Sequence, residues 1–138
     1  MKRFAVTGAG LAALGVAMIA CCSMTAANNL AEPTIKDVMD KVNKGKDCLK
    51  NGIDADIKAA KWDDLTTKAK ELVPLAKALG KNDPPKGDKE SWKKLTDAYA
   101  KAAVDLEAAA EKKDATAAAT AFKGLTGCMG CHSVHRGK

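Results

Sequence analysis

Aromatic and β-branched residues are scarce in this chain, and their scarcity argues against a β-sheet. Phe, Trp and Tyr together make up only 4% of the 138 residues, and strands favour aromatic and β-branched side chains. Proline occurs at only four positions, so few segments are barred from a helix. Alanine and lysine dominate the remainder, and both are good helix formers. The composition therefore predicts an all-α protein.

A block of like charge is also missing. The formal net charge is +6, but the lysines are interspersed with aspartates and glutamates along the chain. Basic tails and patches that bind nucleic acid are clustered instead. We therefore expect no nucleic-acid partner and regard most lysines as a solvated surface.

The first 27 residues have the pattern of an export signal. Residues 1–3 are Met-Lys-Arg, residues 4–22 are small and almost wholly apolar, and residues 23–27 allow cleavage after Ala27. A membrane anchor is one alternative. Lipoprotein processing at Cys21 or Cys22 is another, although the residues before them fit that pattern poorly. Each route takes the chain out of the cytoplasm, and a signal peptide at residues 1–27 predicts a periplasmic protein.

Residues 28–138 then form one domain of about 110 residues. Loss of the signal removes Lys2 and Arg3 but no acid, so the net charge falls from +6 to +4. Four amphipathic helices can be read in this part from apolar residues at a 3.6-residue period. Short connections between such helices predict an antiparallel four-helix bundle.

The ends of these helices follow local signals. The first is expected to begin at Thr34, which can cap it with Asp37, and to be interrupted at Asn51-Gly52. The second is expected over 56–79, with Gly80 as its stop. A loop at 81–88 contains tandem prolines. The third helix ends near Lys112-Lys113, and the fourth follows Asp114 and runs into the C-terminal motif without a break.

That motif is Cys128-Met129-Gly130-Cys131-His132, the attachment signature of c-type haem. The two thiols form thioethers with the haem vinyl groups, and the histidine lies under the macrocycle, where its imidazole can ligate iron. Cys128 and His132 share a helical face with the apolar stripe of the fourth helix, so we expect His132 to face the core.

Two other chemistries use similar residues. A thioredoxin-like Cys-x-x-Cys begins a helix after a strand, but here a helical pattern precedes the motif. Zinc could use Cys128, Cys131, His132 and His135, although the adjacency of Cys131 and His132 makes tetrahedral closure awkward. Haem c is the interpretation that the motif favours.

A haem motif on the last of four helices resembles the class II cytochromes c, the cytochrome c′ family, over essentially all of residues 28–138. The resemblance implies an up-down-up-down bundle. It also implies that Arg136, four residues after the ligand histidine, lies near the haem. An aromatic residue often precedes that arginine in the family, whereas this chain has His135.

The segment Ile35–Met39 resembles the family's segment on the distal side of the haem. A methionine there implies six-coordinate iron with axial ligands His132 and Met39, which suits electron transfer. A bulky apolar residue instead leaves iron five-coordinate, and such members bind nitric oxide or carbon monoxide. Methionine on an apolar stripe is commonly core filler, so both functions stay open, with the electron carrier preferred. Met129, inside the motif, is not expected to reach the distal face.

The remaining expectations concern partners and single residues. Electron carriage makes the chain a non-enzymatic protein whose partners are redox proteins of the periplasm or the membrane respiratory chain, and a loose ring of lysines could steer an acidic one. A peroxidase is disfavoured because the first helix has no histidine or arginine. We expect His135 at the surface or near a propionate, and Cys48 buried near the end of the first helix, with an intermolecular disulfide as its alternative. Family members often form homodimers, and the resemblance leaves that open.

Overall fold

The computed structural model describes residues 32–137, which form helices and no strand. The predicted signal peptide, including Cys21 and Cys22, lies outside the described residues. Six helices follow one another: α1 (Ile35–Asn43), α2 (Leu49–Ala59), α3 (Trp62–Leu79), α4 (Lys89–Glu111), α5 (Ala115–Thr126) and α6 (Cys128–His135). The predicted all-α class is confirmed for this part of the chain.

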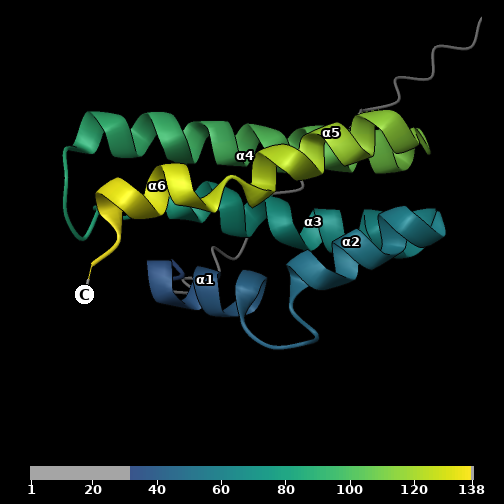
Figure 1. Ribbon diagram of the computed structural model, residues 1–138, viewed down its shortest axis with the longest axis horizontal. Coiled ribbons are helices and arrows are strands. Elements are labelled where there is room, and N and C mark those ends of the chain that lie inside the picture. The colour runs from purple at the N-terminus through teal and green to yellow at the C-terminus, as the bar shows by residue number, and fades with distance from the viewer. Residues whose placement is uncertain (1–31, 138) are drawn as a thin grey trace, which may run out of the picture. The chain divides into compact units, whose positions relative to one another are not determined.

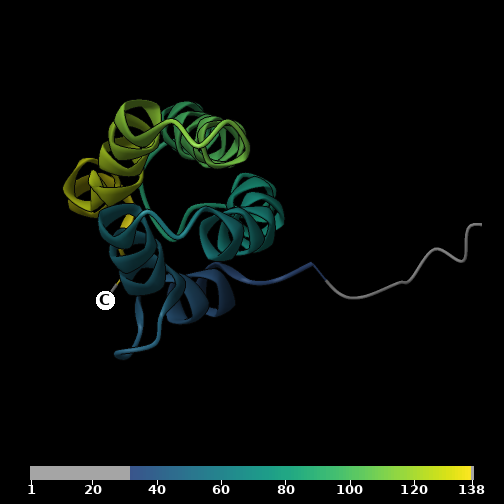
Figure 2. The same ribbon diagram turned by 90° about the vertical axis from the view of Figure 1, so that its right-hand side faces the viewer.

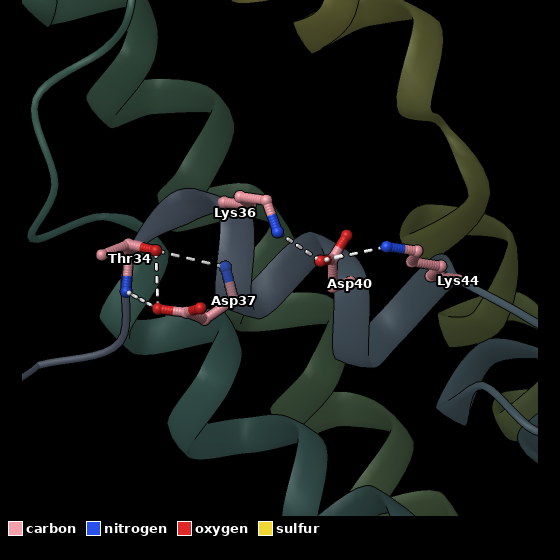
Figure 3. A network of polar contacts seen from close by, with 5 residues as sticks. All are labelled: Thr34, Lys36, Asp37, Asp40 and Lys44. Carbon is pink, nitrogen blue, oxygen red and sulfur yellow. Dashed lines mark hydrogen bonds and ion pairs between the residues drawn. The ribbon is translucent and has the colours of Figure 1, made fainter.

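The first helix begins where the capping signal placed it. Thr34 Oγ1 accepts a hydrogen bond from the backbone N–H of Asp37 at 3.2 Å, and the Asp37 carboxylate accepts one from the backbone N–H of Thr34 at 3.1 Å (Figure 3). This reciprocal capping box satisfies two otherwise unpaired donors. Further along α1, Asp40 accepts from Lys36 and also pairs with Lys44. These exposed pairs add little stability but support the helix locally.

Three further boundaries agree with the sequence. Helix α3 ends at Leu79, immediately before Gly80, and the proline-containing loop follows it. Asp88 caps α4 by accepting from the backbone N–H of Ser91 at 2.6 Å. Asp114 caps α5 by accepting from the backbone N–H of Ala117 at 2.9 Å. At the starts of α4 and α5, a short acidic side chain satisfies a donor that the first helical turn leaves free.

The predicted interruption at Asn51-Gly52 is wrong. Both residues lie inside α2, and the break falls earlier, at 44–48, where Gly45 adopts φ +88°. A Cβ at Gly52 would approach Lys68 Cε to 2.8 Å, so a larger residue there would require the Lys68 side chain to shift. Glycine costs an isolated helix about 1 kcal/mol, which tertiary packing can offset.

Two predicted continuous helices are each divided by a short break. Ala60, in the left-handed conformation with φ 52°, ends α2, so α3 begins at Trp62 rather than near Asp56. Gly127 separates α5 from α6, so the Cys-x-x-Cys-His motif forms a helix of its own instead of completing the preceding one.

The helices pack around a core of small and medium side chains. Helix α4 makes its most extensive contacts with α3 and α5, and α2 packs on α3. The chain turns back between α3 and α4 through the loop, and α6 continues the course of α5 (Figure 1). Figure 2 shows the same helices nearly end-on. The largest apolar side chains that are less than 2% exposed are Ile53, Leu65, Leu72, Leu106 and Val38.

An ion pair between α2 and α3 is partly buried. Lys68 Nζ lies 2.5 Å from Asp56 Oδ2, and the Asp56 side chain is only 8% exposed. None of the helices within residues 32–137 is long and apolar enough to span a membrane.

Candidate functional site

A cavity of about 620 Å³ opens between the two ends of the described chain. All six described helices contribute to its wall, α2 and α3 through one residue each, together with the loop before α4. Ligand-binding cavities typically measure about 300–1,000 Å³ and are largely apolar with a few polar groups. The apolar and aromatic part of the lining consists of Ile35, Met39, Leu79, Pro85, Trp92, Leu95, Ala98, Tyr99 and Leu125.

All five site residues predicted from the sequence line this cavity. Cys128, Cys131 and His132 come from α6, Arg136 follows directly after it, and Met39 comes from α1. These segments are far apart in sequence, so only tertiary packing brings Met39 to the cavity that the motif lines.

The two motif cysteines are free thiols and half-buried. Burial, and secondarily the negative charge that Cys128 would carry as a thiolate, raises the pKa of the Cys131 thiol. Thiols that perform disulfide exchange have lowered pKa values instead. Although Cys128 begins a helix, as in thioredoxin-like motifs, a helix rather than a strand precedes it. The helix before the motif, where a thioredoxin-like motif has a strand, is therefore the feature that argues against thiol redox chemistry.

The two histidines differ in their hydrogen bonding. His132 is half-buried, and no protein group within residues 32–137 hydrogen-bonds to its imidazole. The His135 ring is 1% exposed, with Nδ1 2.9 Å from the carbonyl oxygen of Lys86 and Nε2 3.0 Å from Ser91 Oγ. Of the two histidines, His132 is thus the one whose ring nitrogens have no hydrogen bond to the described protein and could bind a metal.

His135 was expected at the surface or near a propionate, and its burial shows that the surface position is wrong. Its ring packs edge-on against Trp92, with centroids 5.4 Å apart and an interplanar angle of 72°. The loop before α4 closes over it at Gly87, where a Cβ would come within 2.7 Å of His135 Nδ1. Trp92 is fixed in turn, because its Nε1 donates to the carbonyl oxygen of Asn82 at 2.7 Å. His135 therefore anchors α6 to the start of α4.

These contacts bear on the zinc alternative. Because Nδ1 and Nε2 of His135 are both engaged, a zinc ion would have to displace a buried contact to recruit that ring. Over residues 32–137, no three His, Cys, Asp or Glu side chains are grouped to share a metal ion. A four-ligand zinc site would require rearrangement of α6.

Met39 is half-buried and has one polar contact. Its Sδ accepts a hydrogen bond from Asn43 Nδ2 at 3.7 Å, and both residues line the cavity. Sequence analysis had not singled out Asn43, although its position one helical turn after Met39 places both on one face.

The charged groups in the lining are cationic. Lys50, next to the start of α2, and Arg136 contribute positive charge, and no carboxylate is among the residues that line the cavity. Burial, and secondarily the charge of Cys128, raises the pKa of Tyr99 to about 12. The cavity thus suits an apolar ligand that carries negative groups.

No protein-family model, curated protein or solved structure was found to match this chain. The function is therefore argued from the residues of the chain and the arrangement of its cavity.

Proposed function

We propose that this chain is an exported electron-transfer cytochrome that carries one covalent haem c. The observation that carries the proposal is the convergence of Met39, Cys128, Cys131 and His132 on a single, largely apolar cavity. The motif alone suggests haem attachment. The shared cavity adds the thioether sulfur of Met39, on α1, to the residues of the motif.

The donor set fits a haem. Two thiols three residues apart match the spacing needed for thioether attachment, and the next residue offers an imidazole nitrogen. Apolar and aromatic side chains suit a macrocycle, and Lys50 and Arg136 could pair with its two propionates. By these criteria the cavity has suitable chemistry at each part of the cofactor.

In this proposal, His132 and Met39 would hold the haem iron. When bound, the haem supplies a one-electron ferric/ferrous couple, and His/Met ligation raises its reduction potential. The chain's own part is to hold both ligands, exclude water from the cavity and keep exogenous ligands out. No substrate is transformed, so we propose that the protein is not an enzyme.

The proposed fold is an up-down-up-down four-helix bundle, as the resemblance to the cytochrome c′ family implies. The six helices are compatible with a four-helix bundle if α1 and α2 are counted as one interrupted helix and α5 and α6 as another. Export to the periplasm is proposed from residues 1–27. Redox proteins of the periplasm or the membrane respiratory chain are the proposed partners.

Visible spectra of the haem-loaded full chain test this function. We expect a low-spin spectrum in both oxidation states, a weak far-red band from iron–methionine bonding and no change with carbon monoxide. Met39→Ala should become high-spin and bind carbon monoxide. Met129→Ala is the matched control, because the Met129 side chain is 75% exposed and its loss should leave the spectrum unchanged.

Two results would contradict the proposal. A low-spin Met39→Ala protein would exclude Met39 as the ligand. A high-spin wild-type protein that binds carbon monoxide would instead support the alternative gas-binding function of a five-coordinate cytochrome c′.

A further inference from the structure

Asn43 is the one side chain found hydrogen-bonded to the sulfur of Met39 within residues 32–137. The two residues lie one turn apart near the end of α1, and the amide Nδ2 is 3.7 Å from the thioether Sδ. That distance is long for oxygen acceptors but ordinary for the larger sulfur atom, which is a weak acceptor.

The rest of α1 fixes where this pair lies. Val38 and Val42 are 0% and 4% exposed, so their burial sets the rotation of the helix about its axis. The capping box at Thr34 sets its start. With rotation and start both determined, Met39 and Asn43 are held at the cavity wall.

We propose that Asn43 is a positioning residue for Met39 and raises the reduction potential of the site. This inference rests on the proposed His132/Met39 ligation. A thioether sulfur has two lone pairs, so an amide N–H can occupy one while the other remains free for a metal. The hydrogen bond limits rotation of the Met39 side chain and selects the free lone pair.

The expected direction follows from charge. A hydrogen bond to the ligand sulfur withdraws electron density from it, and ferric iron depends on that density more than ferrous iron does. Hydrogen bonds to ligands are one of the means by which a protein tunes a haem potential. The Asn43 amide should therefore favour the reduced state.

Asn43→Leu tests the proposal, since it keeps a side chain of similar size and removes the donor. Asn43 is exposed, so the variant should fold, and circular dichroism checks this. We expect the reduced state to lose about threefold to tenfold in stability relative to the oxidised state, a fall of about 28–59 mV for one electron. The ferrous variant should also bind carbon monoxide more readily, because Met39 is held less firmly.

The same substitution in a Met39→Ala background is the control. If Asn43 acts through the Met39 sulfur, Asn43→Leu should not change the potential when that sulfur is missing. An equal shift in both backgrounds would overturn the proposal, because it would show a direct effect on the haem. A shift of less than about 1.5-fold (about 10 mV) in the wild-type background would overturn it as well.

The failure of this inference can be told from the failure of the proposed function. A wild-type spectrum without iron–methionine bonding would refute both. A wild-type spectrum with that bonding, joined to an unchanged potential in Asn43→Leu, would refute only the role of Asn43.

Discussion

Substitution of Gly87 with alanine should destabilise the folded chain, because two separate costs meet at this position. Gly87 has φ +80°, a left-handed conformation that disfavours any residue with a Cβ. A Cβ there would also lie 2.7 Å from Nδ1 and 3.0 Å from Cε1 of His135. The His135 ring cannot retreat cheaply, since both of its nitrogens are hydrogen-bonded and Trp92 packs against it.

The two costs can be given separate magnitudes. A left-handed conformation costs an L-residue about 1–2 kcal/mol. An extra methyl group forced into a packed site costs about 1–3 kcal/mol. Gly87→Ala should therefore reduce the free energy of unfolding by about 2–5 kcal/mol.

Gly45→Ala is a matched control that isolates the contact with His135. Gly45 has φ +88°, but a Cβ there would meet nothing within 4 Å. The free energy of unfolding of Gly45→Ala should therefore fall only by the cost of the left-handed conformation, about 1–2 kcal/mol. Replacing glycine also makes the unfolded chain less flexible, and this stabilising effect is common to both variants. Urea unfolding of both variants and the wild type measures the difference. If the two variants lose the same free energy of unfolding within about 0.5 kcal/mol, the close contact between the loop at Gly87 and His135 is refuted.

Two further predictions concern a partly buried ion pair and a partly buried phenol. Lys68→Met should cost about 1–3 kcal/mol because it leaves the Asp56 carboxylate, which is 8% exposed, without its hydrogen-bond partner. Asp56→Asn should cost less, since the Lys68 side chain is 32% exposed and can reach water. Urea unfolding that ranks the two variants in the opposite order would contradict this reasoning. Tyr99 is the only tyrosine, so phenolate absorbance reports it directly, and its midpoint should lie near pH 12 in the folded chain and near 10 in denaturant. Because the pKa is raised on folding, its stabilising contribution is complete below pH 10 and is lost as the pH rises towards 12; a folded-state midpoint near 10 would show that Tyr99 is not buried.

Helix starts were predictable because their signals are local. Thr34 with Asp37, and Asp114, satisfy backbone donors within one turn, so a few residues contain the whole interaction. Breaks were less predictable. Ala60 adopts a left-handed conformation with no sequence signal, and the backbone bond from Lys61 N to Asp56 O at 2.9 Å helps to hold it.

The motif residues of the candidate site could be identified for the same reason, but their tertiary neighbours could not. Cys128, Cys131 and His132 form one short motif, and their types alone indicate haem attachment. The burial of His135 depends on the loop at Gly87 and on Ser91, which are distant in sequence. No periodic pattern on a single helix could have predicted that contact.

The break at Gly127, absent from the expectation of one continuous helix, has a consequence for the site. Helices α5 and α4 lie close together at Gly124, where a Cβ would be only 3.1 Å from Ala102 Cβ. The cavity lining on this side of the chain begins at the same residue and continues through the motif. If α5 and α6 were one continuous helix, the direction of the Cys128 side chain would be set by the apolar face of α5 that ends in Leu125. With a separate α6, the contacts of His135 orient the motif independently of the packing of α5. Cys128, Cys131 and His132 can therefore line an open cavity, although Ala118 and Ala121 before them are packed into the core.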